Sequence, residues 1–134
     1  MSRKLSAVPL FPHHDGRSQQ IGGDIFDSVP YGSDCYVIKG VLHDFNDDQC
    51  VTILSNCRKA VHLEGRVVIA NQDLPSPIDG PHPNLTLDIN MMTVLNGRER
   101  SEDEWSELFL RSGLSLSEAY KTESWFALID GVAA

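Results

Sequence analysis

Basic residues are scarce in this chain. Lys and Arg number 11 against 19 Asp and Glu, and the formal net charge is -8 at pH 7. Proteins that bind a nucleic-acid backbone depend on clustered Lys and Arg, and the few basic residues here are scattered along the sequence. We therefore expect no DNA or RNA partner. No apolar run approaches the roughly 18 residues needed to cross a bilayer, so no membrane partner is expected either.

Cysteine is also rare, and its spacing excludes the common redox and zinc motifs. The three cysteines, Cys35, Cys50 and Cys57, form no CxxC pair. Cys50 and Cys57 lie two helical turns apart, which is typical of small buried residues on one helix face. Pro9 interrupts the short apolar stretch near the start, so we expect no signal peptide. Together these features favour a reduced, cytoplasmic protein, and 134 residues suffice for one domain.

The apolar pattern of residues 35–70 predicts a strand, a helix and a second strand. Residues 35–38 are continuously apolar and predict a strand buried on both faces of a parallel sheet. Apolar residues then recur at spacings of four, three and four, which predicts a helix over residues 47–61. Gly65 separates this helix from a second buried strand over residues 66–70. This order indicates a right-handed βαβ crossover, and therefore an α/β fold.

The second half of the chain predicts a loop, two helices and a hairpin. Four prolines between residues 71 and 84 exclude a helix or a central strand, so this stretch is interpreted as a long loop. Helical spacing follows over residues 85–95. Ser101 and Glu104 form an S-x-x-E capping box that predicts the start of another helix, which Gly113 ends. Residues 114–121 and 124–129 predict a terminal antiparallel β-hairpin.

The segment 37–50 carries the first candidate for chemistry. The predicted strand ends at a polar turn that contains His43, and chemistry in α/β domains collects outside the carboxyl ends of parallel strands. We interpret His43 as a general base. The alternative is a calcium loop, because residues 44, 46 and 48 match three ligand positions of an EF-hand pattern. That pattern needs Gly where the chain has Gln49 and Glu where it has Ser55, so no metal site is expected.

A set of short motifs stands in one order along the chain. They are Gly22-Gly23-Asp24-Ile25-Phe26, Lys39 ahead of His43-Asp44-Phe45, Asn56-Cys57-Arg58-Lys59-Ala60, Leu74-Pro75, Asp88-Ile89-Asn90-Met91-Met92 and Gly97-Arg98-Glu99-Arg100-Ser101. With these motifs the chain resembles the cation-independent, S-adenosylmethionine-dependent O-methyltransferases. This group includes plant caffeate and flavonoid enzymes and bacterial polyketide-tailoring enzymes. The likeness covers about residues 21–130.

The resemblance implies part of a known architecture. Residues 21–134 would form the C-terminal part of the catalytic domain, after an irregular leader over residues 1–20. The fold expected is a partial Rossmann-like class I methyltransferase domain, with parallel strands, crossover helices and a C-terminal antiparallel β-hairpin.

The resemblance also implies contacts with S-adenosylmethionine. Asp24 stands where the family's GGD aspartate approaches the adenosyl group, and Ile25 takes the neighbouring apolar position against the adenine. Lys39 matches a lysine that lines the same site. Each residue has a plainer alternative that the sequence leaves open. Asp24 could cap a turn after the two glycines, and Lys39 could extend its ammonium from the end of a strand into water.

For catalysis, the resemblance assigns His43 as the base and Glu99 as the carboxylate that orients it. Met91 corresponds to a methionine beside the ring of the methyl acceptor, a hydroxylated aromatic small molecule. A phenol has a pKa near 10 and His one near 6.5, so a histidine can take the phenolic proton near neutral pH. The plainer alternatives are that Glu99 belongs to a solvated charge cluster and that Met91 fills the core.

Two departures from the family pattern limit these implications. Many members have a second glutamate just after the strand at residues 66–70, where this chain has Asn71. The glycine-rich loop and the ribose-binding carboxylate expected upstream of Gly22 are missing, as is the helical dimerisation domain. Gly16 is the only glycine in the first 21 residues.

Three hypotheses follow. The first is an O-methyltransferase that acts on a phenolic or polyketide-like hydroxyl through His43. The second is a non-catalytic remnant or interaction module that pairs with a complementing chain, or forms a homodimer. The third is an incomplete gene model whose true start lies upstream. In each case we expect the isolated chain to bind S-adenosylmethionine poorly.

Overall fold

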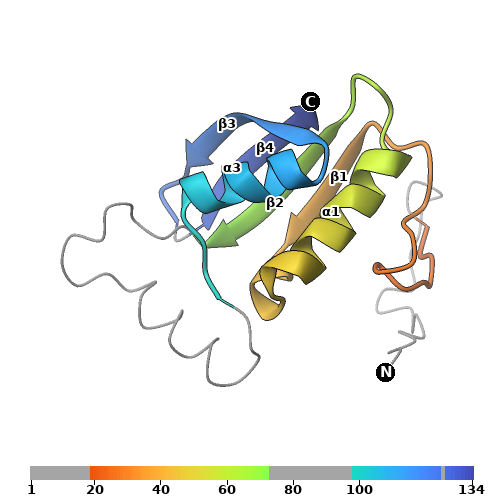
Figure 1. The fold of residues 1–134 in the computed structure, drawn as a ribbon, viewed down its shortest axis with the longest axis horizontal. Helices are drawn as coiled ribbons and strands as arrows, with labels where there is room; N and C mark the ends of the chain where they lie inside the picture. Colours follow the sequence, from red (N-terminus) through yellow and green to blue (C-terminus); the bar gives the residue numbers. More distant parts are fainter. Residues whose placement is uncertain (1–18, 73–97, 125) are drawn as a thin grey trace.

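The described part of the chain forms a mixed α/β fold in which two α-helices pack on a four-stranded sheet (Figure 1). The computed structural model describes residues 19–72, 98–124 and 126–134. The elements in chain order are β1 (Cys35–Lys39), a 3-10 turn (Leu42–Asp44), α1 (Asp47–Ala60), β2 (Arg66–Gln72), α3 (Glu102–Arg111), β3 (Leu114–Lys121) and β4 (Phe126–Ala133).

The sheet has the order β1-β2-β4-β3. β1 and β2 are parallel and are joined through α1, whereas β4 is antiparallel to both β2 and β3. The α/β class, the βαβ unit and the terminal hairpin are therefore confirmed. The second strand of the hairpin begins and ends later than predicted, at Phe126 and Ala133. The helix predicted over residues 85–95 lies outside the described residues.

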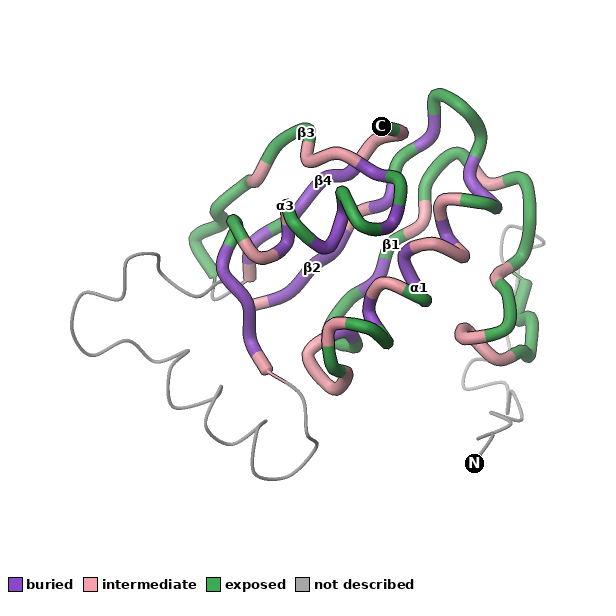
Figure 2. Tube along the Cα trace, in the orientation of Figure 1, coloured by how far each residue is buried: buried purple, intermediate pink, exposed green. Residues whose placement is uncertain are grey.

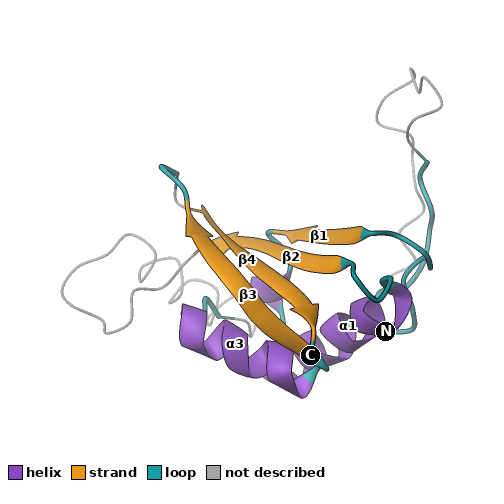
Figure 3. Ribbon diagram, turned by 90° about the horizontal axis from the view of Figure 1, so that it is seen from above, coloured by secondary structure: helices purple, strands orange, loops and turns teal. Residues whose placement is uncertain are grey.

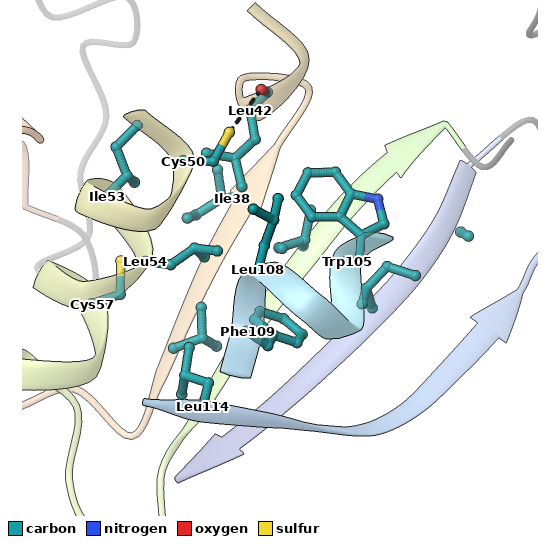
Figure 4. Close-up of a cluster of buried hydrophobic side chains, with 14 residues drawn as sticks. Ile38, Leu42, Cys50, Ile53, Leu54, Cys57, Trp105, Leu108, Phe109 and Leu114 are labelled. Atoms are coloured by element: carbon teal, nitrogen blue, oxygen red, sulfur yellow. Dashed lines mark hydrogen bonds between the residues drawn. The ribbon is translucent and has the colours of Figure 1, made fainter. Parts of the chain in front are cut away.

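Seen along the sheet, α1 and α3 lie on the same face of it (Figure 3). Their apolar sides, with the inward residues of the strands, form one buried cluster that includes Leu54, Trp105 and Phe109 (Figure 4). Full burial of each such side chain contributes about 1.5 to 3 kcal/mol. Cys50 and Cys57 belong to this cluster, as their spacing predicted. None of the helices in the described part of the chain is long and apolar enough to span a membrane.

Both described helices begin at capping boxes. Ser101 and Glu104 cap α3 as predicted. Asn46 and Gln49 form a second box at the start of α1, where Asn46 Oδ1 accepts from the Gln49 amide at 3.0 Å. This cap fixes the point at which the chain leaves the 3-10 turn and enters the helix.

The prediction that β1 is buried on both faces is wrong. Ile38 is buried in the core, whereas Val37 is 66% exposed. The trace of β1 in Figure 2 accordingly changes between exposed and buried colours along its length. β1 is the edge strand of the sheet, and the helices of the described residues cover only one face. A short run of apolar residues has the same appearance in sequence whether one face or both faces are covered.

Candidate active site

His43 lies in the 3-10 turn that joins the end of β1 to the start of α1. Gly40 turns the chain away from the strand with a φ of 61°, which a residue without a side chain adopts readily. The Gly40 amide still donates to the carbonyl of Ala70 on β2, so the beginning of this connection is fixed to the sheet. The His43 side chain is 21% exposed, so one side of its ring is accessible to solvent.

Asn71 and Glu99 meet the ring of His43 on its Nδ1 side. Asn71 Oδ1 lies 3.2 Å from His43 Nδ1, and Glu99 Oε1 lies 3.6 Å from the same nitrogen. Asn71 Nδ2 in turn donates to Glu99 Oε2 at 3.1 Å. Asn71 and Glu99 are both only 2% exposed. The two predicted catalytic residues are thus brought together, and Asn71 joins them.

These contacts indicate which nitrogen of the neutral His43 ring carries the proton. A carboxylate only accepts hydrogen bonds, so the Asn71 amide must turn its NH2 group toward Glu99 and its oxygen toward His43. The oxygen can only accept as well, and therefore Nδ1 of His43 carries a proton. In the neutral ring Nε2 then carries the lone pair, and it faces Asp44.

Asp44 lies on the opposite side of the ring. Its Oδ1 is 3.2 Å from His43 Nε2, and its side chain is 38% exposed. When Nε2 is protonated, the carboxylates of Asp44 and Glu99 flank the imidazolium and stabilise its charge. The sequence shows Asp44 next to His43, but adjacency alone does not indicate that the two side chains meet.

Cys50 packs beneath the turn from the first part of α1. Its Sγ donates to the Leu42 carbonyl at 3.3 Å, the contact drawn in Figure 4. Burial raises the pKa of the Cys50 thiol to about 11, so the sulfur is a neutral thiol at neutral pH. Cys50 therefore supports the turn and is not a nucleophile.

The residues predicted to line the cofactor contact other parts of the chain. Asp24 Oδ1 accepts from the Phe26 amide at 2.9 Å, which is the turn-capping alternative. Ile25 packs against the core. Lys39 places its Nζ 5.4 Å from the centre of the Phe126 ring. The described residues thus bring a histidine together with two carboxylates, whereas Asp24, Ile25 and Lys39 contact other groups. Met91 lies outside the described residues.

Comparison with known proteins identifies the family. A model of the O-methyltransferase domain matches residues 6–115. The chain belongs to this O-methyltransferase family. Cephaeline 6'-O-methyltransferase IpeOMT1 from Carapichea ipecacuanha is 33% identical over 122 residues, which cover 87% of this chain and 35% of the relative. Phenazine O-methyltransferase PhzM from Lysobacter antibioticus is 34% identical over 114 residues, which cover 85% of this chain and 33% of the relative.

Solved structures of O-methyltransferases have the same fold in the matching part. CalO1, a methyltransferase of calicheamicin biosynthesis solved with SAH bound, superposes with a TM-score of 0.82 at 33% identity, over 90% of this chain and 35% of that one. NcsB1 from neocarzinostatin biosynthesis was solved with S-adenosylmethionine and 2-hydroxy-5-methyl naphthoic acid. It superposes with a TM-score of 0.78 at 31% identity, over 89% of this chain and 34% of that one. The chain spans about a third of the length of these O-methyltransferases.

Proposed function

We propose that this chain carries the acceptor-activating part of an S-adenosylmethionine-dependent O-methyltransferase, with His43 as the general base. The observation that carries the proposal is the contact of His43 Nδ1 with Asn71 and Glu99, which places the proton of the neutral ring on Nδ1. Nε2, which lies beside Asp44, is then the proposed proton acceptor. The acceptor class is a phenolic or polyketide-like hydroxyl on a small aromatic molecule. NcsB1, which was solved with a hydroxylated naphthoic acid, supports this class.

The chemistry needs little more than a base and alignment. S-adenosylmethionine supplies an activated methyl group as a sulfonium, so the acceptor oxygen has only to lose its proton to become a good nucleophile. His43 Nε2 takes that proton, and Glu99 and Asp44 stabilise the imidazolium that results. Asn71 keeps the ring in the productive tautomer without adding a charge.

The remaining assignments follow from this proposal. Residues 21–134 are the C-terminal part of the catalytic domain. Asp24, Ile25 and Lys39 are the proposed contacts of the cofactor, and Met91 is the proposed neighbour of the acceptor ring. The larger part of the cofactor site would be supplied by the portion of the fold that the relatives have and the described residues lack.

Methyl transfer from S-adenosylmethionine to a panel of hydroxylated naphthoates and phenols tests the role of His43. We expect His43→Gln to lower the rate by about 10² to 10⁴, the usual contribution of a general base. His62→Gln is the matched control, because His62 is an exposed histidine after α1 and is outside the cluster. Measurable transfer at equal rates by His43→Gln and the wild-type chain would remove His43 from the mechanism.

The second candidate is a module that pairs with a complementing chain. The observation that favours it is the edge strand β1, whose Val37 is exposed, in a chain that spans a third of its relatives. We expect the isolated chain to bind S-adenosylmethionine only weakly in calorimetric titration. Micromolar affinity would contradict this expectation. Light scattering on the isolated chain distinguishes a homodimer from a monomer that awaits another polypeptide.

A further inference from the structure

Arg100 is buried directly beneath the turn that carries His43. Its side chain is 0% exposed. One guanidinium nitrogen, Nη2, donates to the Phe45 carbonyl at 2.8 Å, and Nη1 donates to the Leu42 carbonyl at 3.3 Å. These two carbonyls lie on either side of His43 and Asp44 in the chain. The guanidinium therefore connects both ends of the turn.

The charge of Arg100 is balanced by the first turn of α1. Asp47 Oδ1 accepts from Nε at 2.9 Å and from Nη2 at 2.7 Å, and the guanidinium lies 5.2 Å from the centre of the Trp105 ring. Partial burial disfavours the charged form of Asp47. The hydrogen bonds and charges of Arg100 and Arg98 outweigh this effect and lower the pKa of Asp47, so the carboxylate is ionised at neutral pH.

A buried arginine is costly, because its charge must be taken out of water. Replacing a buried ion pair by well-packed apolar residues is often neutral or stabilising. The position of Arg100 supplies a reason for keeping it. Its neighbour Glu99 faces the imidazole of His43, while Arg100 holds the carbonyls of the same turn. Two consecutive residues thus fix the ring and the backbone of one histidine.

We propose that Arg100 is a positioning residue for His43. It restrains the backbone of the Leu42–Asp44 turn so that the imidazole reaches Asn71 and Glu99. The consequence for catalysis rests on the proposed function, whereas the restraint of the turn can be measured without any methyl transfer. The planar guanidinium group has several N–H donors and can contact two carbonyls and a carboxylate at once. A lysine ammonium cannot reproduce that geometry.

Arg100→Lys separates the geometry of the contact from its charge. The matched control is Arg111→Lys, because Arg111 pairs at 2.8 Å with Asp48, the neighbour of Asp47, and its pair with Asp48 is exposed at the surface. Amide hydrogen exchange of Asp44 and Phe45 reports on the turn, since these amides donate to Val41 and Leu42. The imidazole nitrogen shifts of His43 report on its contact with Asn71.

We expect Arg100→Lys to speed exchange of the Asp44 and Phe45 amides by about tenfold or more, the effect of losing a charged hydrogen bond. The His43 shifts should move toward those of a mixture of tautomers. Arg111→Lys should change neither. Wild-type exchange and shifts in Arg100→Lys would overturn the proposal, as would equal changes in both variants. Loss of the whole fold in Arg100→Lys would also overturn it, because Arg100 would then be a general core residue.

These measurements keep the two proposals apart. If the chain transfers no methyl group, the exchange of the turn amides still shows whether Arg100 restrains His43. If the exchange is unchanged but His43→Gln abolishes transfer, His43 is the base and Arg100 does not position it.

Discussion

Asn71→Asp tests whether the amide between His43 and Glu99 is what stabilises this buried cluster near neutral pH. The substitution puts a carboxylate oxygen where the Asn71 NH2 group donates to Glu99 at 3.1 Å, between two side chains that are 2% exposed. At that separation and an effective dielectric constant of about 20, two unit charges repel by about 5 kcal/mol. The shape of the side chain hardly changes, so the main perturbation is the charge.

Proton uptake relieves the repulsion, and this makes the effect depend on pH. A proton shared by the two carboxylates restores a donor between their oxygens, so the pKa of the pair in the folded variant is raised above the value near 4 of the unfolded chain. Stability from a raised folded-state pKa is present at low pH and is lost as the pH rises through that raised value. Protonation of His43 offsets part of the repulsion, so we expect a loss below the full Coulomb energy.

Urea unfolding followed by tryptophan fluorescence, to which buried Trp105 contributes, measures the effect. Asn71→Leu is the matched control, because it removes the same hydrogen bonds without adding a charge. We expect Asn71→Asp to be at least as stable as Asn71→Leu at pH about 4, and to become about 2 to 4 kcal/mol less stable relative to it as the pH rises to about 8. A difference between the two variants that does not change with pH would refute this account of the cluster.

Two further predictions concern the core. Burial raises the pKa of the Cys50 and Cys57 thiols to about 11, whereas Cys35 is exposed. Iodoacetamide should therefore label Cys35 alone in the folded protein near pH about 8. Rapid labelling of Cys50, detected by mass spectrometry, would contradict the burial of its thiol. Gly131→Ala places a Cβ 2.8 Å from the Phe109 ring, so it should destabilise the fold by about 1 to 3 kcal/mol, and an unchanged unfolding midpoint would contradict this packing.

Local patterns in the sequence predicted most of the described elements. The periodicity over residues 47–61 found α1, which ends one residue earlier, and the Ser101 capping box found the start of α3. Both signals depend on residues three or four positions apart, so no knowledge of the tertiary structure was needed. The burial of β1 depends on what covers each face of the sheet. That information is not contained in five consecutive residues, and the prediction for Val37 was wrong.

The site was predicted less completely than the fold. His43 and Glu99 were found through the order of motifs, and Asn71 was noticed only as a departure from the family pattern. Its contact with both residues requires the register of β2 and the path of the chain at residues 98–101. Arg100 was missed because it stands in a run of alternating charges, which normally indicates a solvated surface. Its burial follows from packing against Trp105 on α3 and from its contacts with Asp47, which is far away in sequence.

The distribution of buried polar groups shows where this part of the fold gives up stability for geometry. Four of the six buried polar or charged residues in the described part of the chain belong to the His43 region or adjoin it: Asn71, Glu99, Arg100 and Ser101. Each needs a specific partner, because an unpaired buried polar group costs about 1 to 3 kcal/mol. An apolar cluster at the same place would hold the helices to the sheet without such partners. Ser101 caps α3, whereas Asn71, Glu99 and Arg100 contact the ring of His43 or the backbone of its turn. These three buried polar residues are therefore better explained by the orientation of His43 than by stability.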